Sequence, residues 1–114
     1  MEETEQILIE NAKEYYRNAT AAEKREEFNT AVTLYFKTLA ALGDLIIYRK
    51  GHKIPSSHAE RFRILEERYP EAYMILDRTF GFYQDSYRRK MDKEISNILS
   101  EDAKKLLKEL NISV

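Results

Sequence analysis

Six side chains in the second half of this sequence are of types that could bind or transform a ligand. They are His58, Arg78, Tyr83, Asp85, Tyr87 and Arg88. At helical spacing Arg78, Asp85 and Arg88 fall on one face. Gly81 would leave a hollow among them, and paired guanidinium groups beside a hollow suit phosphate because each can donate two parallel hydrogen bonds. The alternative is a set of surface ion pairs, which contribute little to stability.

Aromatic residues recur at helical spacing through the same segment. Tyr73, Leu76, Phe80, Tyr83 and Tyr87 follow one another at alternating steps of three and four residues. Such a face can be a platform on which nucleic-acid bases stack. It can also be an ordinary core face whose hydroxyl groups reach the rim. The sequence leaves both interpretations open.

No other pattern in the sequence points to catalysis. The absence of Cys excludes disulfides, thiolate metal sites and Cys nucleophiles. His52 and His58 flank a loop, but they lack the spacing of a metal site, and we expect His58 to pack or to hydrogen-bond near a helix start. Neither a Ser-His-Asp arrangement nor a glycine-rich phosphate loop is present. We therefore predict no metal, no cofactor and no catalytic residue.

The composition predicts one all-helical domain over residues 1–114. Three Gly and two Pro interrupt a chain rich in Ala, Leu, Glu, Lys and Arg, which favour helices. Charged residues make up 34% of the chain, yet the net charge is −1. Nonspecific nucleic-acid binders are usually strongly basic, so the overall charge argues against that class while leaving room for a local basic patch.

The N-terminal sequence MEETE is acidic, which is the opposite of a signal peptide. The longest apolar run, within Leu39 to Tyr48, is interrupted by Gly43 and Asp44 and is too short to span a bilayer. We therefore expect a soluble cytoplasmic protein without a membrane partner.

The segment from Phe28 to Tyr48 is expected to form the helix around which the others pack. Its main apolar series alternates steps of four and three: Phe28, Val32, Tyr35, Leu39, Leu42 and Ile46. Further apolar positions cover most of the circumference, and such a helix is buried. The narrow polar seam that remains consists of Asn29, Thr30, Thr33, Lys37 and Asp44.

The helices before and after this segment are marked by capping residues. A first helix covers residues 4 to about 23, and the charged run 23–27 is a plausible corner. This boundary has two alternatives: a capping box formed by Thr20 and Glu23, or a single helix that continues into the second. The second helix ends near residues 49–50, with Gly51 as its left-handed terminal residue. Ser57 and Glu60 form a capping box that begins the third.

The last two helices have softer boundaries. Pro70 ends the third helix at Tyr69 and can begin the fourth, which should fade between residues 89 and 94. Ser100 should cap a short last helix, and Asn111 can stop it. Residues 95–99 either extend this helix backward or form a short turn.

The order of these features resembles that of HEPN domains (higher eukaryotes and prokaryotes nucleotide-binding) over most of the chain. The second helix of that family has an aromatic residue shortly before an Ala-x-x-hydrophobic-Tyr run, here FNTAVTLYFKTLAA from Phe28 to Ala41. A Gly loop then leads to a Ser-His pair, here Gly51 followed by Ser57 and His58. An Arg and a Tyr follow on the fourth helix, and a short last helix begins with acidic residues and Ala.

The resemblance implies an antiparallel up-and-down bundle of four long helices plus a short C-terminal helix, assembled as a homodimer. One branch of the family consists of metal-independent ribonucleases with Arg-x4–6-His on the fourth helix. Another accompanies small nucleotidyltransferases in toxin–antitoxin pairs and often has Arg-x3-Asp-Tyr. Here Arg78 fits both patterns, Tyr83 stands at the His of the first, and Phe82 replaces the Asp of the second.

The replacement of His by Tyr83 favours the non-nuclease branch. Imidazole titrates near neutrality, whereas a phenol with a pKa of about 10 is a poor proton acceptor at pH 7. We therefore predict a non-catalytic module that binds a nucleotide, a nucleic acid or a partner nucleotidyltransferase. Its expected binding residues are Arg78, Tyr83, Asp85, Tyr87 and Arg88, with His58 beside them. The alternatives are a divergent ribonuclease toxin, with His58 as the missing base, and a purely structural interaction subunit.

Overall fold

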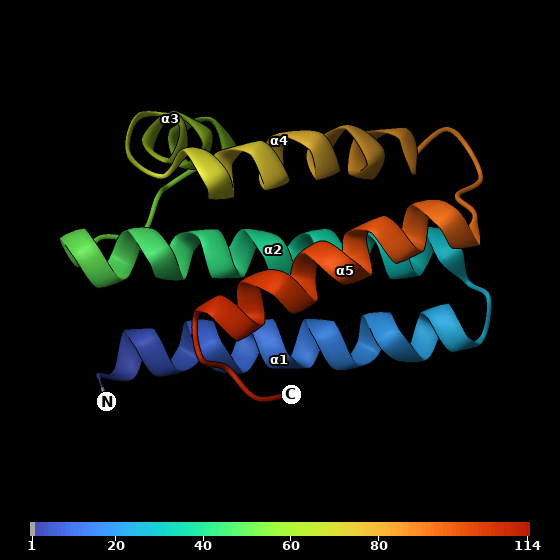
Figure 1. Ribbon diagram of the computed structural model, residues 1–114, viewed down its shortest axis with the longest axis horizontal. Coiled ribbons are helices and arrows are strands. Elements are labelled where there is room, and N and C mark those ends of the chain that lie inside the picture. The colour runs from blue at the N-terminus through green and yellow to red at the C-terminus, as the bar shows by residue number, and fades with distance from the viewer. Residues whose placement is uncertain (1) are drawn as a thin grey trace.

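The computed structural model describes residues 2–114, and these residues form five helices and no strand. The helices are α1 (Glu3–Lys24), α2 (Phe28–Gly51), α3 (His58–Arg68), α4 (Pro70–Asp85) and α5 (Lys93–Glu109). In Figure 1, α1, α2 and α4 lie as roughly parallel rods, α5 crosses α2 obliquely, and α3 is seen nearly end-on. The predicted all-α bundle is confirmed, but the short helix is α3 and not the C-terminal one.

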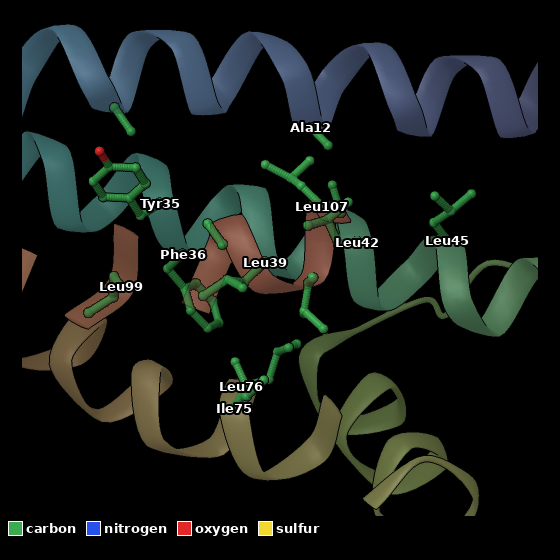
Figure 2. Close-up of a cluster of buried hydrophobic side chains, with 14 of the residues drawn as sticks. Ala12, Tyr35, Phe36, Leu39, Leu42, Leu45, Ile75, Leu76, Leu99 and Leu107 are labelled. Carbon is green, nitrogen blue, oxygen red and sulfur yellow. The ribbon is translucent and has the colours of Figure 1, made fainter. Parts of the chain in front are cut away.

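Helix α2 is the centre of the fold, since it contacts each of the other four helices. Leu39 and Leu42 on α2 are fully buried. Figure 2 shows α2 side chains lying between Ala12 of α1, Leu76 of α4 and Leu107 of α5. The periodic apolar series thus identified the core helix correctly.

The burial of α2 also decides how its apolar character should be understood. By length and composition this helix could cross a membrane, but 61% of its apolar window is buried inside the protein. A core helix of a soluble protein has this property, because its apolar surface is covered by neighbouring helices instead of lipid. The fold is therefore that of a compact soluble domain.

The corner between α1 and α2 forms within the charged run, as one of the sequence alternatives proposed. Helix α1 continues to Lys24, so neither the Thr20–Glu23 capping box nor a single continuous helix is formed. Glu23 instead accepts hydrogen bonds from the Tyr35 hydroxyl at 2.8 Å and the Ser96 hydroxyl at 2.6 Å. This carboxylate ties the end of α1 to α2 and α5. Burial raises the pKa of Tyr35 to about 12.

Glu26 in that corner has φ 61°, which is the left-handed region. A Cβ in this region costs roughly 1–2 kcal/mol, and glycine avoids the cost but loses more chain entropy on folding. We therefore expect Glu26→Gly to raise the free energy of unfolding by about 0.5–1 kcal/mol in urea denaturation. The control Glu14→Gly, on an exposed helical position of α1, should lower it by about 1 kcal/mol. If both substitutions lower the free energy of unfolding, the backbone at Glu26 is not strained.

The connection from α4 to α5 is held by one side chain of α2. The Asn29 amide group donates to the carbonyl oxygens of Ser86 and Arg89, each at 2.8 Å, and its Oδ1 accepts from the Met91 amide at 2.9 Å. These bonds satisfy the backbone of a turn. Helix α4 consequently ends at Asp85, several residues before the predicted end.

The start of α5 also differs from the prediction. Asp92 is the cap residue, and its Oδ1 accepts from the Ile95 amide at 2.9 Å. Ser100 is buried inside the helix and caps nothing, so the prediction that it begins the last helix is wrong. The alternative that residues 95–99 extend the helix backward is confirmed. Asn111 follows the helix with φ 60°, as expected for a stop residue.

The boundaries around α3 agree with the sequence except at its preceding loop. The Ser57 hydroxyl accepts from the Glu60 amide at 3.1 Å, and Pro70 is the first residue of α4. The Glu60 carboxylate reaches the Ser56 amide at 2.8 Å. Gly51 remains helical, and His52 with φ 58° takes the left-handed position expected of the glycine.

Candidate functional site

The predicted site residues fall into two separate groups. Arg78 lies in a hollow of about 420 Å³, between α4 and α5. A second hollow, which we call the aromatic hollow, has a volume of about 610 Å³. Its lining consists of His58, Phe80, Tyr83, Gln84, Asp85, Tyr87 and Arg88. Five of the six predicted residues are thus brought together, and Arg78 is not among them.

The predicted common face of Arg78, Asp85 and Arg88 forms only in part, since Arg78 and Asp85 are seven residues apart on α4 but Arg88 follows the end of the helix. Helix α4 ends at Asp85, so helical spacing no longer places Arg88 above it. Asp85 pairs with Arg89 at 3.2 Å, and Arg78 donates to Asp102 of α5 at 2.6 Å. The first pair lies at the end of α4 and the second joins α4 to α5, and ion pairs were the alternative that the sequence offered.

Gly81 makes no hollow either. A Cβ built at this position would meet nothing within 4 Å, so the residue faces open space. The close approach occurs at Gly43 of α2, where a Cβ would lie 3.1 Å from Leu76 Cδ2 and 3.4 Å from Leu65 Cδ1. The glycine that lets helices approach is therefore on the core helix, where it admits α3 and α4.

Tyr83 and Tyr87 form the aromatic wall of the hollow. The Tyr83 ring stacks on the core residue Phe36, with centroids 4.8 Å apart and planes at 17°. The centroids of the Tyr83 and Tyr87 rings are 5.5 Å apart in an edge-to-face arrangement, and the two hydroxyl oxygens lie 2.9 Å apart. This hydrogen bond and partial burial raise the pKa of Tyr83. Tyr83 thus packs on the core, as one of the two sequence interpretations expected, whereas Tyr87 is 74% exposed.

Behind the hollow lies an ion pair that sequence analysis did not assign. Arg61 of α3 donates from Nε to Asp44 Oδ1 at 2.7 Å and from Nη2 to Asp44 Oδ2 at 3.1 Å. Both side chains are only 11% exposed. A bidentate geometry of this kind compensates the cost of removing two charges from water. The pair fixes α3 against the middle of α2.

Arg61 also determines the tautomer of His58. Its Nη1 lies 2.7 Å from His58 Nδ1. A guanidinium group can only donate, so Nδ1 accepts, and the proton of the neutral imidazole is on Nε2. Burial lowers the pKa of His58, the positive charges of Arg61 and Lys37 lower it further, and Asp44 opposes them. The ring is therefore neutral at pH 7, with one N–H donor left over.

A third, smaller hollow of about 240 Å³ adjoins the aromatic hollow, and we call it the polar hollow. His58 and Tyr83 line both. Its other polar lining residues are Asn11, Tyr15, Lys37, Asp44 and Arg61, supplied by α1, α2 and α3. Lys37 Nζ lies 5.8 Å from the centroid of the Tyr15 ring. The polar hollow and the aromatic hollow thus share the wall formed by His58 and Tyr83, and their linings together come from four helices.

The chain shows no relationship that would assign a function directly. Comparison with protein-family models, curated proteins and solved structures finds no match. Within residues 2–114, no three His, Asp or Glu side chains are grouped closely enough to hold a metal ion. What the site can do must therefore be argued from its own geometry.

Proposed function

We propose that the protein is a non-catalytic, HEPN-like module that binds a nucleotide or a nucleic acid in the aromatic hollow. The observation that supports this most directly is the Tyr87 ring, which is 74% exposed at the hollow and fixed by Tyr83. Stacking of a base on such a ring contributes about 1–3 kcal/mol. Arg88, exposed in the same hollow, supplies a positive charge for phosphate.

The arrangement of His58 favours binding over cleavage of RNA. A general base needs an unprotonated nitrogen within reach of the hydroxyl that it activates. Here Nδ1 is occupied by Arg61, and Nε2 carries the proton. Arg78 lines a different hollow, and that hollow has no lining residue in common with the aromatic hollow, where His58 lies. The alternative of a divergent ribonuclease, with His58 as its base, is correspondingly less well supported.

The proposal includes a cytoplasmic homodimer formed through the exposed side of α4. Met74 is 69% exposed there, and Gly81 has open space in front of it, so a second helix could approach closely. A small nucleotidyltransferase, the partner that the HEPN resemblance implies, is the alternative occupant. Light scattering should give twice the chain mass of 13.5 kDa. A mass of one chain would remove the homodimer from the proposal.

Removal of the exposed ring tests the binding site. Tyr87→Ala should weaken binding of ATP or of a fluorescent single-stranded oligonucleotide about 10- to 100-fold in calorimetry or anisotropy. Tyr87→Phe is the matched control, because it keeps the stacking surface and the edge-to-face contact with Tyr83 and loses only the hydrogen bond between the hydroxyl groups. It should bind within about threefold of wild type.

The charge of Arg88 gives a second measurement of the same site. Arg88→Ala should weaken binding and reduce its dependence on salt, whereas Arg63→Ala on exposed α3 should change neither. Equal affinities for wild type and Tyr87→Ala would place the ligand elsewhere. Failure of wild type to bind any nucleotide or oligonucleotide would leave only the protein-partner role.

A further inference from the structure

The polar hollow is lined on three helices by hydrogen-bond donors. Lys37 of α2 and Asn11 of α1 are both exposed, and neither side chain makes a hydrogen bond within the described chain. His58 lines the hollow as well, and its Nε2–H group has no partner among residues 2–114. Amide, ammonium and imidazole N–H groups grouped around one depression are suited to an anion with several acceptor oxygens.

The charge balance of this hollow also favours an anion. Its only carboxylate, Asp44, is neutralised by the bidentate contact with Arg61. All three side-chain nitrogens of Arg61 are engaged, two with Asp44 and one with His58. Lys37 is therefore the one lining residue with an uncompensated charge in the described structure. It lies over the Tyr15 ring and not beside a carboxylate.

The position of the polar hollow relates it to the aromatic one. The imidazole of His58 and the ring of Tyr83 belong to the walls of both. A ligand with a flat ring against Tyr87 could thus extend past Tyr83 and bring a charged group toward Lys37. Arg78, which was expected to hold phosphate, lies in the separate hollow between α4 and α5.

We propose that the polar hollow is a phosphate subsite, in which Lys37, Asn11 and the His58 Nε2–H group hold a phosphate of a nucleotide whose base lies in the aromatic hollow. This inference rests on the proposed function. The phosphate could be the terminal group of a mononucleotide or the linking group of an oligonucleotide, and the two have the same acceptor chemistry at this subsite. The site would distinguish nucleotides from nucleosides.

Calorimetry with adenosine, its 5′-monophosphate, the dinucleotide ApA and inorganic phosphate tests this assignment. Wild type should bind the monophosphate or ApA at least about tenfold more tightly than adenosine, as expected for charge-assisted hydrogen bonds. Lys37→Ala should abolish that difference and leave adenosine unaffected. Asn11→Ala should reduce it by about threefold. Lys50→Ala, which removes the same charge from the exposed end of α2, is the matched control and should behave as wild type.

The outcomes separate the two proposals. If the monophosphate is preferred, the phosphate is a terminal group; preference for ApA alone identifies a linking phosphate, and both support the subsite. If Lys37→Ala and Asn11→Ala keep the full difference while Tyr87→Ala loses binding, the subsite is wrong and the aromatic site stands. If none of the four probes binds to wild type and oligonucleotides also fail, the proposed function is wrong as well.

Discussion

Asp44→Ala is expected to lower the free energy of unfolding by about 3 kcal/mol, because it leaves a largely buried guanidinium group without its carboxylate. The substitution removes both carboxylate oxygens that accept from the Arg61 guanidinium and leaves only His58 Nδ1 as an acceptor. The Arg61 side chain is 11% exposed, and its Cδ lies near Gly43 of α2. An unpaired charge in that position must either stay desolvated or pull α3 away from α2. Urea denaturation followed by circular dichroism measures the change.

Two comparisons make this prediction specific to the buried pair. Glu67→Ala breaks the exposed pair with Arg63, where both side chains are 59% exposed, and should cost no more than about 0.5 kcal/mol. The double substitution Asp44→Leu with Arg61→Met removes both charges together and should recover most of the loss. A loss below about 1 kcal/mol for Asp44→Ala would mean that the ion pair does not fix α3.

The helices of this fold could be predicted where the pattern is local. The apolar series on α2, the Ser57 cap and Pro70 at the start of α4 each depend on neighbouring residues, and all three are found. The end of α4 and the start of α5 could not be predicted. They depend on Asn29, which reaches a turn about sixty residues later in the chain.

The site followed the same division between local and distant interactions. Helical spacing correctly grouped Tyr83 with Tyr87. Tyr87 follows the end of α4, and its amide bonds back to the Gln84 carbonyl at 3.3 Å, so the turn keeps it beside Tyr83. The Asp44–Arg61 pair joins two helices across a loop, and no spacing rule reports it. One signal was present: a carboxylate in the most apolar segment of the chain requires a partner when it is buried. The sequence does not say which of its many cations that partner is.

Phe36→Ala is expected to cost about 3–5 kcal/mol and, unlike other core truncations, to weaken ligand binding as well. Phe36 is 1% exposed, stacks on Tyr83 at 4.8 Å and lies 6.2 Å from the His58 ring. It therefore supports the wall that the two hollows share. Loss of the ring leaves a cavity behind Tyr83, so both side chains of the wall should become less fixed. Denaturation gives the stability, and calorimetry with the monophosphate at low temperature gives the affinity.

Leu39→Ala is the matched control for this coupling between core and site. Leu39 is fully buried on the same helix but lines neither hollow, so its truncation should cost about 2–5 kcal/mol and leave affinity unchanged. If Phe36→Ala proves too unstable to measure, Phe36→Leu fills more of the space and should still lower the affinity. Equal affinities for the Phe36 and Leu39 variants would show that Tyr83 and His58 do not depend on the core ring. The hollow would then be a feature of the α4 surface alone, and the link between the buried helix and ligand binding would be lost.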